Sequence, residues 1–252
     1  MNNIRFEIDG KTVTRNTPEE WNELTLKQLL FVVPRVMFVN KSRRLRSEIL
    51  FNFLGKEIKG IEGLNQSQLN ALFAAVDWLF KVPQLTINLL PKVEILKIVF
   101  NGPEDELKDI SVSQFAFADK FMSQFLKSRD EQYLDLVIGA LYVRHGHKFV
   151  KEEIEATAAY IKHLPLDKRL AILAFFMGSR HKIAEQNKDI FKKSNKVRRS
   201  KSGWLGFFYE LAGPKIGNYN QVADMNFFEM LGIMRKINED ARETEKRNRK
   251  RK

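Results

Sequence analysis

GPEDELKDISVSQFAFADKFMSQFLKSRDEQYLDLVIGALYVR, residues 102–144, carries two amphipathic helical patterns in tandem. Apolar residues recur in each pattern at spacings of three and four, which places them on one face of an α-helix. The first face consists of Val112, Phe115, Ala118, Phe121, Met122 and Phe125, and the second of Tyr133, Leu134, Val137, Ile138, Leu141 and Tyr142. Only the short polar segment 127–130 separates the two patterns. We therefore predict a helical hairpin at the centre of the core, in which Phe121 and Leu141 are buried and face each other.

The composition is that of a folded protein without disulfides. The 252 residues are 44% hydrophobic and 29% charged, and none of them is cysteine. The lack of cysteine excludes disulfides, thiolate metal sites and a cysteine nucleophile, and suits a reducing compartment. The opening MNNIRFEIDGK lacks the apolar core of a secretion signal, and no apolar run approaches the ~20 residues of a membrane span. We expect a soluble, intracellular protein with one large domain or two small ones.

The first hundred residues predict a β-hairpin followed by helices. Alternating apolar residues and the turn signal Asp9-Gly10 predict a hairpin at 3–15. The expected helices begin with the capping signals at Thr17 and Thr25 and then occupy 41–54 and 67–80. VEILKIVF, residues 93–100, is rich in β-branched residues, so we expect one strand there that pairs with the N-terminal hairpin.

Helical patterns also dominate the rest of the chain. They are expected at 151–164, 165–178 and 204–211, and in a long amphipathic helix that starts near Gln221 or Asp224 and continues past Asn238. The predicted fold class is therefore mainly α: a helical, bundle-like domain with a small N-terminal β-hairpin and one further strand. The expected divisions are a main domain at 1–180, a basic linker or exposed helix at 181–203, a C-terminal helical pair packed on the main domain at 204–241, and a disordered basic tail at 242–252.

The positive charge is concentrated in two segments. The chain carries a formal net charge of +12. Residues 182–201 hold eight Lys or Arg against two acidic residues, and residues 242–252 hold seven against two, so that these segments contribute +6 and +5. The remainder is close to neutral overall, which predicts two local basic segments on an ordinary domain rather than a basic groove across the fold.

These segments supply the candidate contact residues for nucleic acid or an acidic partner. They are Lys192, Lys193, Lys196, Arg198, Arg199, Lys201, Arg247, Arg249, Lys250 and Arg251. Lysines and arginines neutralise phosphates, and the aromatic residues of 204–209 suit stacking on bases. The alternative is that these aromatic residues form a buried helix face while the lysines only solubilise a linker. A smaller basic group, Arg43, Arg44 and Arg46, opens the helix at 41–54 and forms either a solvated face or a surface for an acidic partner.

No pattern typical of an enzyme is present. The chain lacks a phosphate-binding loop, a dinucleotide fingerprint and a nucleophile elbow. The pair His145 and His147 has no third metal ligand at a useful spacing, and the acidic run Glu104-Asp105-Glu106 is typical of a solvated helix start. The sequence therefore predicts a protein that is not an enzyme and holds no cofactor or metal.

Five stretches carry a resemblance to a known group of proteins. They are TPEEWNELTLKQLL (17–30), FNGPEDELKDISVSQFAFADKF (100–121), YLDLVIGALYVR (133–144), RLAILAFFMGSR (169–180) and WLGFFYELAGPKIGNYNQVADMNFFEML (204–231). In their pattern of apolar positions and glycines they resemble poorly characterised proteins of tailed bacteriophages and prophages, especially those of Bacteroidetes hosts. The last stretch is also similar to phage tail assembly chaperones, which are helical proteins that hold the tape-measure protein while the tail tube is built.

The resemblance implies a role in virion morphogenesis. Apolar grooves between helices would hold amphipathic helices of a phage structural protein, such as the tape-measure protein or another tail component. It implies a location in the host cytoplasm during assembly, or in the virion. Two alternatives stay open at this point: a nucleic-acid-binding protein that uses 182–201 and 242–252, and a structural component of the virion, since 252 residues is long for such a chaperone.

Overall fold

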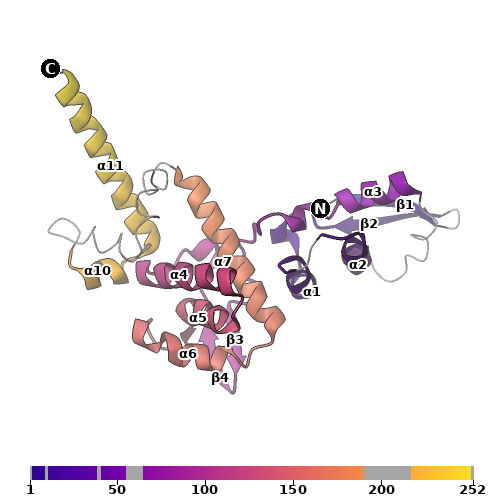
Figure 1. Cartoon of the computed structure of the whole chain (residues 1–252), viewed down its shortest axis with the longest axis horizontal. Coiled ribbons are helices and arrows are strands. Elements are labelled where there is room, and N and C mark those ends of the chain that lie inside the picture. The colour runs from indigo at the N-terminus through magenta and orange to yellow at the C-terminus, as the bar shows by residue number, and fades with distance from the viewer. Residues whose placement is uncertain are drawn as a thin grey trace. The chain divides into compact units, whose positions relative to one another are not determined.

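The computed structural model describes residues 2–8, 11–38, 41–54, 65–188, 190 and 217–250. These residues are mainly helical, with a two-stranded and a three-stranded sheet, which confirms the predicted fold class (Figure 1). The chain divides into two compact units. Unit 1 comprises Met1–Leu89 and Pro165–Ser179, and unit 2 comprises Leu90–Leu164 and Arg180–Lys252. Helix α7 (Leu166–Gln186) contributes residues to both units.

Unit 1 opens with the expected β-hairpin. Strands β1 (Asn2–Ile8) and β2 (Lys11–Thr17) are antiparallel, with Asn2 opposite Thr17 at the far end of the ladder. The helix predicted to begin at Thr17 is wrong, because that residue is still paired in the ladder and is buried. Between Thr17 and the first long helix the chain forms only the short 3-10 turn η1 (Trp21–Glu23).

The first long helix begins where the capping signal predicts. Helix α1 (Leu26–Val36) starts after Thr25, whose backbone N–H donates to Gln28 Oε1 at 2.9 Å. The backbone N–H of Gln28 donates in return to Thr25 Oγ1 at 3.3 Å, which completes a capping box. The same arrangement joins Asn65 and Gln68 at the start of α3 (Gln66–Ala74). At these two positions the signal could be recognised in the sequence because both partners lie within one turn of chain.

The remaining elements of unit 1 surround a mixed aromatic and aliphatic core. They are α2 (Arg43–Leu54), the 3-10 turn η3 (Asp77–Phe80), and the first part of α7, whose residues 170–176 are all buried. Trp21 and Trp78 meet edge to face, with ring centroids 5.8 Å apart. The helix predicted at 67–80 is interrupted, since α3 ends at Ala74 and the chain resumes as η3.

Unit 2 contains a small antiparallel sheet that sequence patterns did not predict. The expected single strand at 93–100 is wrong: the chain reverses at Leu96 and Lys97 to give β3 (Lys92–Ile95) and β4 (Ile98–Asn101). Both turn residues have left-handed backbone, with φ of 50° and 66°. The third strand is β5 (Val143–Arg144), directly after the helical hairpin, so the N-terminal hairpin is not the partner. A Leu-Lys pair lacks the Asn-Gly signature of such a turn, which explains the error.

The predicted helical hairpin is confirmed and lies in the core of unit 2. Helices α4 (Val112–Ser128) and α5 (Glu131–Leu141) are joined by two residues, Arg129 and Asp130. Almost every residue of α5 after its first turn is buried. Phe121 is only half-buried and stacks on Phe117 at 6.1 Å, so the expectation that it is fully buried is wrong. Phe115 takes the central position and is 1% exposed.

Helices on both sides cover this hairpin. Helix α6 (Ile154–Ile161), preceded by the 3-10 turn η5 (Lys151–Glu153), packs on α5. The 3-10 turn η4 (Asp105–Leu107) leads into α4. The predicted C-terminal helix is present but divided into α10 (Tyr219–Asp224) and α11 (Phe227–Lys250).

The break between α10 and α11 is a docking point on the start of α4. Asn226 forms a bridge with Ser111, and its side-chain amide donates to Lys108 O at 2.7 Å. The next residue, Phe227, stacks on Phe115 with ring centroids 3.9 Å apart. These long-range contacts interrupt a sequence that on its pattern alone predicts one continuous helix.

Helix α11 continues through most of the segment for which we predicted a disordered tail. Residues 242–250 are helical, as Figure 1 shows at the C-terminal end of the chain. Arginine, lysine and glutamate have good helix propensity, and Glu243 and Arg247 form an i,i+4 ion pair at 3.7 Å. The opposite charges thus offset part of the repulsion on which the prediction of disorder rested.

Candidate interaction surfaces

Most of the first predicted basic segment lies outside the described residues. This holds for Lys192, Lys193, Lys196, Arg198, Arg199 and Lys201, and for the aromatic residues of 204–209. Of the described members, Lys182 pairs with Glu106 at 3.2 Å and Lys188 with Glu185 at 2.6 Å. The hydrogen bond from Lys188 lowers the pKa of Glu185. These two lysines therefore have acidic partners within the chain.

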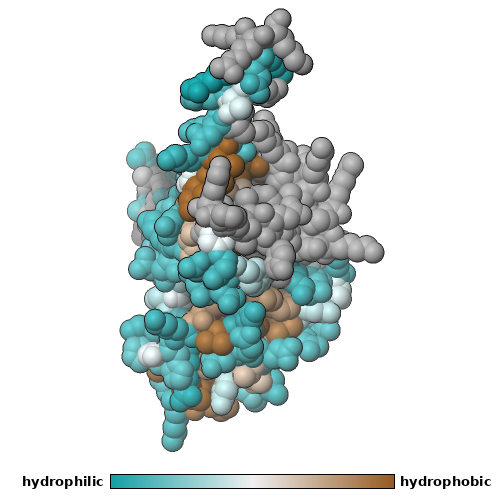
Figure 2. Space-filling view, turned by 90° about the vertical axis from the view of Figure 1, so that its left-hand side faces the viewer, coloured by the Kyte–Doolittle hydropathy of each residue, from teal (hydrophilic) through white to brown (hydrophobic). Residues whose placement is uncertain are grey.

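The second predicted basic segment lies at the exposed end of α11. Arg247 forms an ion pair with Glu243. Arg249 is exposed and also interacts with another part of the protein. Lys250 is the last helical residue, and Arg251 lies outside the described residues. At the top of Figure 2 this part of the helix is coloured hydrophilic, and hydrophobic residues lie directly below it.

A third surface joins α1 and α2 in unit 1, and its charge arrangement was only partly visible in the sequence. Leu29, Val32 and Val33 bury one side of α1, so Phe31 and Arg35, one turn apart, lie on the opposite side. The buried side of α2 consists of Leu45, Ile49, Leu50, Phe53 and Leu54. Arg44, Glu48 and Phe51 accordingly occupy its outer side. We call Phe31, Arg35, Arg44, Glu48 and Phe51 the α1–α2 face.

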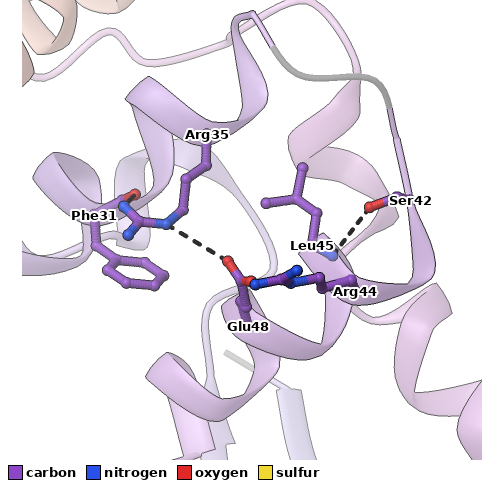
Figure 3. A network of polar contacts seen from close by, with 6 residues as sticks. All are labelled: Phe31, Arg35, Ser42, Arg44, Leu45 and Glu48. Atoms are coloured by element: carbon purple, nitrogen blue, oxygen red, sulfur yellow. Dashed lines mark hydrogen bonds and ion pairs between the residues drawn. The ribbon is translucent and has the colours of Figure 1, made fainter.

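Arg35 is the residue that links the two helices of this face (Figure 3). Its guanidinium carbon lies 3.8 Å from the centroid of the Phe31 ring, and its Nη1 donates to Phe31 O at 2.8 Å. Its Nε lies 3.9 Å from Glu48 Oε2. On the other side of Glu48, Arg44 Nε lies 3.1 Å from Oε1. One carboxylate is therefore shared by an arginine from each helix.

A second shared carboxylate lies near the start of α2. Asp77 Oδ2 is 3.0 Å from Lys41 Nζ, and Asp77 Oδ1 is 3.1 Å from Arg46 Nε. The α2 helix itself begins at a serine cap, in which Leu45 N donates to Ser42 Oγ at 3.2 Å.

Together the basic residues of this region outnumber the acidic ones. The basic cluster consists of Arg35 and Arg44 around Glu48, and of Lys41 and Arg46 around Asp77. Four cations against two carboxylates leave a local net charge of +2. Charge counting along the chain singled out Arg43, Arg44 and Arg46 but not Arg35, because Arg35 reaches the cluster only through folding.

The described residues show no grouping of side chains typical of metal binding. Within the described ranges no three His, Cys, Asp or Glu side chains are grouped to hold a metal ion. His145 Nδ1 lies 3.0 Å from Asn101 Nδ2 beside an exposed turn. The acidic run lies in the 3-10 turn η4, at whose start Glu104 N donates to Asp109 Oδ1 at 2.7 Å. No helix in this part of the chain is long and apolar enough to cross a membrane.

Comparisons of the chain with protein-family models, with curated proteins and with solved structures give no match. Among the described residues, the outer part of α11 and the α1–α2 face are the candidate interaction surfaces.

Proposed function

We propose that this chain is a non-enzymatic protein of tailed-phage assembly that binds another phage structural protein, such as the tape-measure protein, through helix α11. The resemblance of the stretch 204–231 to tail assembly chaperones supplies the class of partner. The single observation that carries the proposal is the change in burial along α11.

The first turns of α11 are anchored and the later ones are exposed. Phe227, Met230, Leu231 and Met234 are buried, whereas Ile237, on the next turn, is 40% exposed. Every residue from 239 to 249 whose burial is described is exposed. An isolated helix of a few turns is marginally stable in water, so a partner packed along this part of α11 would stabilise it.

The chemistry of α11 suits a helix-in-groove partner. Ile233 is half-buried and Ile237 exposed, one turn apart on the same side of the helix. Apolar anchors at this spacing are typical of amphipathic helices that bind to helical partners. The side chains beyond Ile237 carry both positive and negative charges. They can therefore orient a bound partner and keep the helix soluble, as well as attract a partner with complementary charges.

Co-purification tests the proposal. The full chain is co-expressed with the structural proteins encoded beside it, the tape-measure protein first, and the complex is washed at about 0.1 M and about 0.5 M salt. A complex that persists at the higher salt and is lost in Ile237→Glu supports it. Lys236→Glu, a charge change on the neighbouring exposed residue, is the matched control and is expected to bind normally.

The opposite result would indicate the nucleic-acid alternative. In that case DNA or RNA would be retained at physiological salt, with an affinity that falls steeply as salt rises, since phosphate binding releases counterions. Neutralising Lys192, Lys193, Arg198 and Arg199 and deleting 242–252 would abolish that retention, while Ile237→Glu would leave it unchanged. That pattern would refute the proposal.

A further inference from the structure

The row of residues that anchors helix α11 continues along its exposed part. Phe227, Met230 and Met234 are buried and follow one another at spacings of three and then four. The same alternation leads on to Ile237, which is 40% exposed, and then to positions 241, 244 and 248. Spacings of three and four in alternation define the seam of a two-stranded coiled coil. The seam of α11 is therefore longer than the part of it that is buried among the described residues of unit 2.

Beyond Ile237 the seam positions hold small or moderately polar residues. The sequence has alanine at 241, threonine at 244 and asparagine at 248. Thr244 is exposed, and its Oγ1 donates to Asp240 O of the same helix at 2.9 Å. The hydroxyl group of Thr244 therefore already has a hydrogen-bond partner, so burying this side chain leaves no unpaired donor. Such a seam lets a second helix approach but contributes little apolar area.

The charges beside the seam favour one direction for a second helix. Residues that flank the seam of a coiled coil face the partner helix, and on one side of α11 two of them are Asp240 and Arg247. Both are exposed, and the side chain of Arg247 is 78% exposed although it pairs with Glu243 at 3.7 Å. In an antiparallel pair of α11 helices with 241 opposite 244, Asp240 of each copy lies beside Arg247 of the other. Opposite charges then meet at two equivalent contacts.

A parallel arrangement of the same helices gives the reverse result. Parallel helices in register place each of these flanking residues near the residue five positions further along the partner. Asp240 then lies near position 245, which is a glutamate, and Arg247 near position 252, which is a lysine. Both contacts join like charges, which destabilises the pair. The order of charges along α11 is therefore complementary to itself only when the second copy runs antiparallel.

We propose that α11 pairs with α11 of a second copy of this chain as an antiparallel coiled coil, with Asp240 of each copy beside Arg247 of the other. Ile237 lies at the end of the shared seam, and the pairing would remove part of its side chain from water. The inference concerns the chain alone and does not rest on the function proposed above. A structural protein that binds the same side of α11 would have to displace the second copy, so self-association would keep this helix covered until the partner is present.

Sedimentation equilibrium of the full chain at about 0.1 M salt tests the inference. Because Ile237 is the one large apolar residue of the outer seam, we expect a monomer–dimer equilibrium with a Kd on the order of 10–100 µM. Asp240→Arg brings like charges together at both contacts of the dimer, and so does Arg247→Asp. Each variant alone is expected to weaken dimerisation at least ~10-fold.

Mixing the two variants separates a lost contact from a damaged helix. In a mixed dimer the Asp240→Arg chain supplies positive charge at both contacts and the Arg247→Asp chain supplies negative charge, so that opposite charges meet again. The mixture is expected to dimerise with a Kd within about 3-fold of the wild-type value. A loss caused by fraying of α11 would not be restored by mixing. Glu239→Arg makes the same charge change on the neighbouring exposed residue, which points away from the seam, and is expected to leave the Kd within about 2-fold.

Three results would overturn the inference. The first is a wild-type chain that stays monomeric up to ~0.5 mM. The second is a dimer that Asp240→Arg strengthens, as a parallel pair requires, or leaves unchanged, as an interface elsewhere requires. The third is a loss in Glu239→Arg as large as that in Asp240→Arg, or a mixture of the two variants that does not recover, either of which would indicate a general effect of charge or helix stability. These measurements use the chain alone, so their failure is distinct from a failure of the co-purification test.

Discussion

Replacing Gly139 by alanine should destabilise the protein although alanine is the better helix former. Gly139 lies within α5, where α6 crosses it closely. A Cβ atom added there would lie 2.7 Å from Ile154 O, 3.2 Å from Ala158 N and 3.4 Å from Ala158 Cβ. The nearest of these atoms belong to the backbone, so relief requires α5 and α6 to move apart rather than one side chain to rotate.

The size of the effect follows from two opposing terms. Overpacking a closely packed core costs about 1–3 kcal/mol, and replacing a helical glycine by alanine returns about 0.5–1 kcal/mol. We therefore expect the free energy of unfolding to fall by roughly 1–2 kcal/mol in Gly139→Ala. Urea denaturation followed by far-ultraviolet circular dichroism measures this change as a lower midpoint at constant slope.

Gly232→Ala is the matched control. Gly232 also lies in a helix, α11, but a Cβ there would meet no atom within 4 Å. Only the propensity term remains, so this variant should be more stable than the wild type by about 0.5–1 kcal/mol. The same chemical change should thus have opposite signs at the two positions. A Gly139→Ala protein as stable as the wild type would show that α5 and α6 are not packed as described.

Three further stability measurements test other elements. Phe115→Ala should lower the free energy of unfolding by about 3–5 kcal/mol because it removes a buried stacking partner. Phe121→Ala, at a half-buried site, should lower it clearly less, and equal losses would contradict the burial described. Thr25→Ala should cost ~1 kcal/mol through loss of the capping box, and an unchanged urea midpoint would argue against that cap. Leu96→Asn with Lys97→Gly should raise the thermal midpoint, because both positions have left-handed backbone; a lower midpoint would exclude this turn.

Local chemistry in the sequence determined where most helices begin and which side of each is buried. Thr25 and Asn65 identify their helix starts because the capping partner lies three residues away. The spacing of the apolar residues in 102–144 predicted both helices of the central hairpin. Because only two residues link the helices, they pack against each other as a hairpin. The fold class follows from these patterns. The basic residues at the start of α2 could also be identified directly in the sequence.

Tertiary structure alone decided the features that depend on residues far apart in the chain. The turn at Leu96 is stabilised by a sheet whose third strand comes after α5, and the break before α11 is held against α4 by the hydrogen bond from Asn226 to Lys108 O and the stacking of Phe227 on Phe115. The α1–α2 face is of the same kind. Arg35 and Glu48 belong to different helices, and Asp77 joins the cluster from a third element. A pattern read along the chain reports neighbours within a few turns, whereas these contacts form only when the intervening segments fold and bring their ends together.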